Sequence, residues 1–410
     1  MDTSSTATAI VRHLESSLQS VHDGKKTAAS ETTSASSNSS NTKDSSSFII
    51  WKDDSAYKGA LQAYQQSCSV LTDIVTKFSI VIKTDPKDQV LESILIELDR
   101  SLSTIISRYE ELAGLSSLGA PLRKFVANST SGLLYQLLEY LKHAKGRKFQ
   151  KVNVSTGMIW KAIEDVNNLP AGNKMAYKRS MLAKLGVVKD TIREFREVLD
   201  RGPAVASNDA TSSDRQGSEE TVLEGSNAED DAWAVDSDEL YLEEEVGLVE
   251  RAVALMSTGA SYLKALSNLL VSVADRLYDC EDATELCAVF TIALNLSAGG
   301  DGGGDSGSST GQDLCIHWVL AISALCHSLE DVCTDLGAEL YSPIDVDSAS
   351  EYYEKMHSVL SAVNTALEAH SPLLNAEEDR IREDLFASFA KLPAVLSRRQ
   401  NEKEDGEGYI

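Results

Sequence analysis

The sequence contains six cysteines and seven histidines, which are the side chains best suited to hold a metal ion. Cys315 and His317 lie two residues apart, but there is no CxxC pair and no set of four ligands at tetrahedral spacing. Cys326 and Cys333 are seven residues apart, which places them on one face of a helix. Because unpaired cysteines are among the most often buried residues, we interpret them as core residues and predict neither a metal site nor a cofactor.

No motif for nucleophilic catalysis or phosphate binding occurs in the sequence context that such a motif needs. There is no HExxH or GxxxxGK[ST] string, the single GxSxG match at 307–311 lies in a low-complexity stretch rather than after a strand, and the histidines have no partner at a fixed spacing. The glycines at 302–304 lie in a Gly-, Ser- and Asp-rich stretch, 299–311, with no strand before it, so we interpret this stretch as a loop. No catalytic residue is therefore assigned, and we expect a protein without enzymatic activity.

The charge of the chain is strongly acidic. Its 38 Lys and Arg residues stand against 63 Asp and Glu residues, a formal net charge of −25. Binding to nucleic acid phosphates or to an anionic membrane needs a cationic face, so we predict neither kind of partner. The charge favours basic protein partners instead.

More than half of this excess charge lies in one segment. Residues 204–250 contain 15 acidic residues and one Arg, a net charge of −14, and such a run resists collapse. Two interpretations stay open: the segment is a solvated spacer or it docks a basic partner. Trp233 either packs against a bundle or anchors a partner. The candidate partner-binding residues of this segment are Glu229, Asp230, Asp231, Trp233, Asp238, Glu239, Leu240 and Tyr241.

In several further stretches of the chain, apolar residues recur at the spacing of an α-helix. From Leu91 to Leu112 apolar residues recur at alternating steps of four and three, which is typical of packed helices. The pattern recurs over 181–199 and over the unusually long stretch 242–277, where the pair Gly259-Ala260 would let a neighbour approach closely. A further predicted helix carries an apolar stripe of Met158, Ile159, Ala162, Ile163 and Val166. Few aromatics and only 7 prolines also favour helix.

Two LxxLL strings, at 134–138 and 266–270, are a pattern with which helices dock into grooves of partner proteins. Both strings lie on the apolar stripes of predicted helices. We therefore interpret them as parts of the core.

The first twenty residues are polar and mildly amphipathic, and the longest charge-free apolar stretch is too short to span a bilayer. We therefore expect no signal peptide and no membrane segment. A reducing compartment follows as an expectation, and with it cysteines that form no disulfide framework.

The predicted fold class is all-α, with two up-and-down helical bundles joined by an acidic flexible linker. Residues 1–47 are rich in Ser and Thr and are expected to be mostly disordered, with a short helix near 5–22. The expected boundaries are an N-terminal bundle over 48–203, the linker over 204–236, a C-terminal bundle over 237–398 that contains the loop at 299–311, and a charged tail over 399–410.

One string of the sequence resembles a known family. It runs from Trp160 through Leu169-Pro170 to Asn173-Lys174, and Val188-Lys189-Asp190 follow in the next predicted helix. With the acidic segment that leads into a long helix, this string resembles the cyclin-D-binding protein family over about 150–275. The motif positions, which we interpret as structural, are Trp160, Leu169, Pro170, Asn173, Lys174, Val188, Lys189 and Asp190.

The resemblance implies a negative regulator of cell-cycle progression that binds a D-type cyclin and lowers its kinase activity toward a retinoblastoma-type substrate. It implies a helix-loop-helix-like protein without a basic region, able to sequester helix-loop-helix transcription factors. It also implies vinculin-like bundles, residence in both nucleus and cytoplasm, and no catalytic residues. The alternative is a helical-bundle adaptor or scaffold that binds amphipathic helices of cytoskeletal, trafficking or transcription-factor partners.

Overall fold

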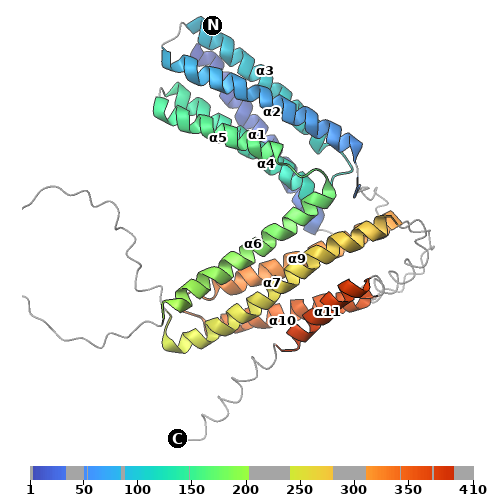
Figure 1. The fold of residues 1–410 in the computed structure, drawn as a ribbon. Coiled ribbons are helices and arrows are strands. Elements are labelled where there is room, and N and C mark those ends of the chain that lie inside the picture. Colours follow the sequence, from blue (N-terminus) through green and yellow to red (C-terminus); the bar gives the residue numbers. More distant parts are fainter. Residues whose placement is uncertain are drawn as a thin grey trace, which may run out of the picture. The chain divides into compact units, whose positions relative to one another are not determined.

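The computed structural model of the protein describes residues 3–33, 50–52, 54–84, 88–146, 148–202, 241–279, 311–341, 343–371 and 374–391. Every regular element in these ranges is a helix, which confirms the predicted all-α class (Figure 1). The acidic linker at 204–236, most of the glycine-rich loop and the charged tail lie outside the described residues.

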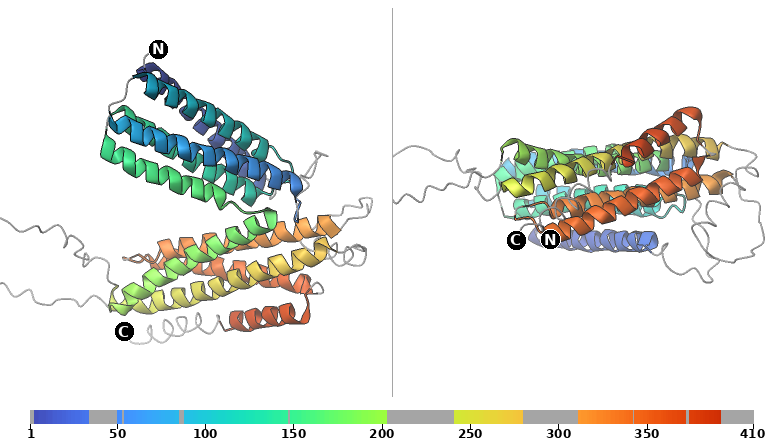
Figure 2. Two further views of the ribbon diagram at one scale, coloured as in Figure 1. Left: turned by 45° about the horizontal axis from the view of Figure 1, so that its top comes forward. Right: turned by 90° about the horizontal axis from the view of Figure 1, so that it is seen from below.

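The chain divides into two compact units, Met1–Ser180 and Met181–Ile410, and the division falls inside one helix. The helices of each unit lie side by side (Figures 1 and 2). The first unit contains α1 (Thr3–Thr33), α2 (Ser55–Val81), the 3-10 turn η2 (Ile82–Thr84), α3 (Asp88–Ala113), α4 (Ala120–Lys145), α5 (Phe149–Asn167) and the start of α6 (Asn173–Asp200). The second unit contains the rest of α6, α7 (Glu243–Tyr278), α9 (Gly311–Ala338), α10 (Val346–Ala369) and α11 (Ala376–Phe389).

Five helices of the first unit pack in a ring. α5 packs against α2 and α4, α2 packs against α3, and α1 packs against both α4 and α3, so that it closes the ring. The leucines of the LxxLL string at 134–138 are buried inside this ring, with Leu134, Leu137 and Leu138 at 0%, 1% and 6% exposure. Its interpretation as core is confirmed, and the same holds for the string at 266–270 in the second unit.

Buried hydroxyl groups add specific contacts to the apolar core of the first unit. The hydroxyl of Ser79 on α2 lies 2.7 Å from that of Tyr140 on α4 and 2.8 Å from that of Thr156 on α5. Tyr64 pairs likewise with Thr130, at 2.8 Å between their hydroxyl oxygens. Because a buried hydroxyl without a partner is costly, these pairs favour one register of α2 against α4 and α5.

Helix α1 extends beyond the short helix expected near 5–22. It runs to Thr33, into a segment whose composition predicts disorder. Its amphipathic spacing explains the packing of its first part, because Ile10, Leu14 and Val21 are 1%, 1% and 2% exposed within the core of the first unit.

The second unit is built around α7, which packs mainly against α9, while α10 packs against α9. Gly259 of α7 makes this close packing possible. A Cβ added there would lie 2.5 Å from Cε of Met356 and 3.1 Å from Sγ of Cys333. The predicted close approach at Gly259-Ala260 is confirmed, with α9 and α10 as the neighbours.

Helix α11 is attached to the second unit chiefly by polar contacts. Only Glu378 and Leu385 of this helix are buried. The carboxylate of Glu378 receives two hydrogen bonds from Arg276 of α7, at 2.7 and 2.6 Å, and the hydroxyl of Tyr262 donates to the carbonyl of Leu385 at 2.9 Å. The pair with Arg276 thus fixes the start of α11 against α7.

The second half of α6 belongs to the second unit by its side-chain contacts. Phe195 lies 5.4 Å from the ring of Tyr341, between centroids, and Arg196 donates to Ser257 of α7 at 3.1 Å. Gly337 lets α9 approach α6, since a Cβ there would lie 2.7 Å from a methyl carbon of Thr191. Sequence periodicity predicts a helix over 181–199 but does not show that α6 begins at Asn173 and belongs to two units.

Candidate protein-binding surface

Asn173 connects three backbone segments of the first unit. Its side chain is only 2% exposed. Its amide nitrogen donates to the carbonyls of Ile50 and Ser117, both at 2.8 Å, and its amide oxygen accepts from the backbone N–H of Gly119 at 2.7 Å. The residue therefore holds the start of α6 against the α3–α4 turn and the chain before α2.

The neighbouring motif residues form the turn between α5 and α6. Leu169 is 7% exposed, and the carbonyl of Pro170 accepts a hydrogen bond from the buried hydroxyl of Tyr57 at 2.7 Å. Burial raises the pKa of Tyr57 well above its usual value, and the charge of Arg179 only partly opposes this. The hydroxyl therefore stays a hydrogen-bond donor to Pro170.

The remaining motif residues of α6 split between core and surface. Val188 is 1% exposed, Lys174 is half-buried, and Lys189 is exposed. Asp190 is also exposed and pairs with Arg193 at 3.1 Å, a contact along one helix surface. The motif is thus distributed over the core, the α5–α6 turn and the surface of α6.

Trp160 differs from the buried motif residues, because it faces outward on α5. It is 47% exposed, and Met158 and Val154 of the same helix are 46% and 68% exposed. Gly157 lies among them in sequence, and a Cβ added there would meet no atom within 4 Å. The outer face of α5 that carries these side chains is here called the α5 patch. Val154 and Met158 are neighbours near one edge of it, and Trp160, about 200° around the helix from Met158, lies at the opposite edge.

The prediction that Met158 lies on the buried stripe of this helix is wrong. Adjacent residues of a helix point about 100° apart, so Met158 and Ile159 do not share a narrow buried face. Ile159 is 0% exposed on a helix that packs against α2 and α4, which leaves Met158 outside. The sequence carries one signal of this arrangement, because Val154 and Met158 are four residues apart and hence on one side of the helix.

Charged groups lie between Met158 and Trp160 on the α5 patch. Lys161, the residue after Trp160, pairs with Glu164 at 3.3 Å and with Asp165 at 3.2 Å. These three side chains are more than half exposed, so their pairs add little to stability. The α5 patch thus combines exposed aromatic and aliphatic side chains with charged ones, and aromatic residues and Met are enriched in protein interfaces.

Among the candidate residues of the acidic segment, only Tyr241 lies in the part of the chain that the structure describes. It is 3% exposed, in the core of the second unit. Burial raises its pKa far above the usual value, and nearby Tyr341 and Glu245 act in the same direction. Tyr241 thus acts as a core side chain here. Outside the described residues lie Glu229, Asp230, Asp231, Trp233, Asp238, Glu239 and Leu240.

The described cysteines lie in the core, as the sequence predicts. Cys68, Cys315, Cys326 and Cys333 are at most 1% exposed. Burial raises the pKa of the Cys326 and Cys333 thiols to about 12. At neutral pH both stay protonated, so they pack as small apolar groups and are poor nucleophiles.

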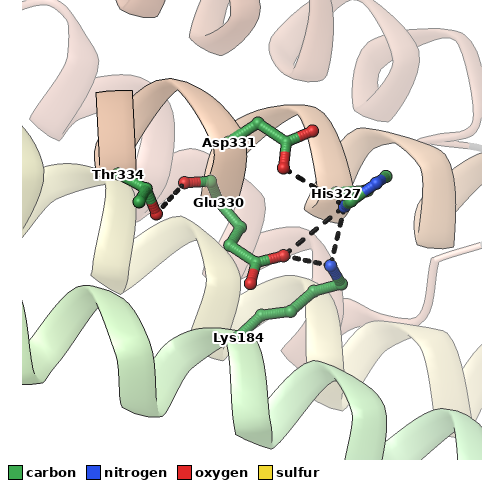
Figure 3. Close-up of polar contacts among 5 residues, drawn as sticks. All are labelled: Lys184, His327, Glu330, Asp331 and Thr334. Atoms are coloured by element: carbon green, nitrogen blue, oxygen red, sulfur yellow. Dashed lines mark hydrogen bonds and ion pairs between the residues drawn. The ribbon is translucent and has the colours of Figure 1, made fainter. Parts of the chain in front are cut away.

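One polar cluster of the second unit resembles a metal site. His327, Glu330 and Asp331 of α9 place three ligand atoms within 4.8 Å of one another (Figure 3). The ammonium group of Lys184 from α6 lies among them, 2.9 Å from Nδ1 of His327 and hydrogen-bonded to Glu330. Because this ammonium supplies the positive charge, we assign the cluster to an ion-pair network that holds α6 on α9 rather than to metal binding.

Sequence reasoning does not find this cluster, although its three residues of α9 stand at the i, i+3 and i+4 spacing of one helix face. The partner that explains it, Lys184, is remote in sequence.

Within the described ranges, no helix combines the length and the apolar character needed to cross a membrane.

Comparison with known proteins identifies the segment that carries these features. Residues 63–201 match the family model described as "Grap2 and cyclin-D-interacting, N-terminal". A protein of Danio rerio, "Cyclin-D1-binding protein 1 homolog", is 25% identical over 140 residues, which are 33% of this chain and 40% of that relative. The matched segment runs from α2 to the end of α6 and includes Asn173 and the α5 patch. Over residues 63–201, this chain is therefore similar to the N-terminal part of Grap2- and cyclin-D-interacting proteins.

Proposed function

We propose that the protein binds a D-type cyclin without catalysing a reaction, and that it thereby lowers the activity of the cyclin's kinase and restrains the cell cycle. The observation that carries this proposal is the family match over 63–201, together with the relative whose name is Cyclin-D1-binding protein 1 homolog. The chain matches two fifths of that relative's length, so the activity is proposed for this chain rather than transferred. Action in both nucleus and cytoplasm is part of the same proposal.

The α5 patch is the surface that we propose for the cyclin. It lies inside the matched segment, and it exposes a Trp and a Met, which are enriched at protein interfaces. Gly157 leaves room near Trp160 for an inserted side chain of the partner. The charged residues Lys161, Glu164 and Asp165, which lie between Met158 and Trp160, would set the orientation of the partner.

The test uses full-length chain with an active D-type cyclin–kinase complex and a retinoblastoma-type substrate. We expect phosphate transfer to decrease with added chain until inhibition saturates. Trp160→Ala should weaken binding about 30-fold, because truncating an aromatic residue that anchors an interface commonly costs about 2 kcal/mol. Ile96→Asp is the matched control, since Ile96 is 48% exposed but lies on α3, whose main contacts are with α2 and α1.

Three outcomes distinguish the parts of the proposal. Binding without inhibition would refute the regulatory role and leave the cyclin as a partner. Equal losses in Trp160→Ala and Ile96→Asp would refute the α5 patch as the binding surface. Absence of cyclin binding would favour the adaptor alternative, in which a bundle binds the amphipathic helix of another protein.

A further inference from the structure

Helix α1 occupies a surface that the other helices of the first unit leave open. α2 packs on α3 and α5, and α4 packs on α5, whereas α3 and α4 share little direct contact. α1 covers this side by packing mainly on α4 and less on α3. The surface between α3 and α4, here called the α3–α4 groove, is thus completed by a segment that precedes the family-matched residues 63–201.

One face of α1 lies in the groove. Ile10, Leu14 and Val21 are buried there with Ser17 between them, and the partly buried Ala7, Val11 and Leu18 pack beside them. The steps between the four buried residues are four, three and four residues, as expected for the buried face of an amphipathic helix.

Two polar contacts join this face. Nδ1 of His13 lies 3.2 Å from a carboxylate oxygen of Asp99 on α3. A longer contact of 3.4 Å links the ammonium of Lys145 on α4 to the hydroxyl of Thr8. Both contacts involve exposed groups, so they add little to the attachment of α1.

The fit of α1 on α4 is incomplete beyond Leu14. An open groove of about 560 Å³ lies between Leu18 and His22 of α1 and Gly132 and Tyr135 of α4. A Cβ added at Gly132 would meet no atom within 4 Å, and Tyr135 is 53% exposed. A helix with a larger side chain at the place of Leu18 would fill this space and cover Tyr135.

We propose that the α3–α4 groove is a docking site for an amphipathic helix of a partner protein, and that α1 is its intramolecular competitor. The partner helix would carry aliphatic residues at the spacing of Ile10, Leu14 and Val21. A cationic residue would face Asp99, and an aromatic residue would lie beside Gly132. This site is separate from the α5 patch, so it goes beyond the proposed cyclin binding.

Competition by α1 follows from its covalent attachment. A tethered helix acts at a high effective concentration, so a free helix of equal affinity binds poorly until α1 is released. A partner helix that fills the space beside Gly132 has an advantage over α1. By competing for the groove, α1 therefore raises the concentration of partner helix that is needed for binding.

The test weakens α1 in the full-length chain and offers a helix in trans. The probe is a fluorescent peptide of residues 3–24. We expect Leu14→Asp to bind this peptide at least about tenfold more tightly than the unaltered chain does. Ser16→Asp is the matched control, because it adds the same charge at an exposed position of α1 and should leave peptide binding unchanged. A peptide with Leu18→Trp should bind more tightly than the original.

Hydrogen exchange of the unaltered chain provides a second measurement. Amides of α1 should exchange at least about tenfold faster than amides of α4, because α1 opens while α2–α5 stay packed. Equal protection of α1 and α4 would overturn the proposal. So would a folded Leu14→Asp chain that does not bind the peptide, or loss of folding in that variant, because α1 would then be integral to the bundle. Cyclin inhibition through the α5 patch would survive each of these failures.

Discussion

At the scale of single residues, Asn173 shows how a short motif organises a bundle end. Its three hydrogen bonds join backbone groups at Ile50, Ser117 and Gly119 to the start of α6. Gly119 is required for this approach, because a Cβ there would lie 3.1 Å from the side-chain oxygen of Asn173 and 3.0 Å from the ring of Tyr177. The sequence reveals the motif but not these partners, since they come from segments distant in the chain.

Asn173→Ala should lower the free energy of unfolding of the first unit by roughly 2–4 kcal/mol. The substitution removes three hydrogen bonds and leaves buried carbonyl and N–H groups without them. Denaturant unfolding with a probe in the first unit measures the change. Asn153→Ala on the exposed side of α5 is the control and should have little effect. A change below about 0.5 kcal/mol in Asn173→Ala would contradict the assigned role.

His370 makes the second unit sensitive to pH. Burial lowers its pKa below the usual value of 6.5, and the contact of Nδ1 with the carbonyl of Ala366 opposes this only in part. The unfolded chain therefore binds the proton more readily, and stability falls as pH decreases from above about 6.5 toward the lowered pKa. The ring of Trp318, 5.2 Å away between centroids, is part of the burial.

Thermal unfolding of the second unit at about pH 7.5 and about pH 5.5, on either side of the usual histidine pKa, tests this dependence. The unaltered chain should lose more stability at the lower pH than His370→Gln does. His317→Gln, a change at an exposed residue of α9, should keep the behaviour of the unaltered chain. Identical pH dependence in His370→Gln and the unaltered chain would rule out His370 as its source.

At the scale of helices, Gly259 sets how closely α7 meets α9 and α10. Gly259→Val should destabilise the second unit by roughly 1–3 kcal/mol, because added carbons would overlap Met356 and Cys333, which are 0% and 1% exposed. Gly186→Val of α6 has no atom within 4 Å of the added Cβ and should change stability by less than about 0.5 kcal/mol. Denaturant unfolding of both variants measures these changes in stability. Equal destabilisation of the two variants would show that close packing at Gly259 does not determine the stability of the second unit.

Helix positions and the all-α class could be predicted from periodicity, because each buried stripe repeats locally. The stripe of Leu98, Leu102 and Ile105 needs no distant information, and these residues are indeed 2%, 1% and 0% exposed. The prediction for Met158 fails because periodicity alone does not fix the width of a buried face. The role of Lys184 and the membership of α6 in two units depend on contacts between remote segments, which a single sequence does not reveal.

At the scale of the whole molecule, the net charge of −25 bears on how partners are recognised. If the acidic residues of 204–236 dock a basic surface, cyclin affinity should fall steeply with added salt, because screening weakens contacts between exposed charges. Deletion of 204–236 should remove most of that salt dependence. An affinity unchanged between low and high salt would assign recognition to apolar contacts such as the α5 patch.

Calorimetric titration of the full-length chain against a D-type cyclin from the same organism tests the central claim most directly. The account predicts saturable binding with a micromolar or lower Kd, weakened in Trp160→Ala and unchanged in Ile96→Asp. Absence of heat, together with absence of co-elution with an active cyclin, would contradict cyclin binding and leave the family match as a likeness of fold.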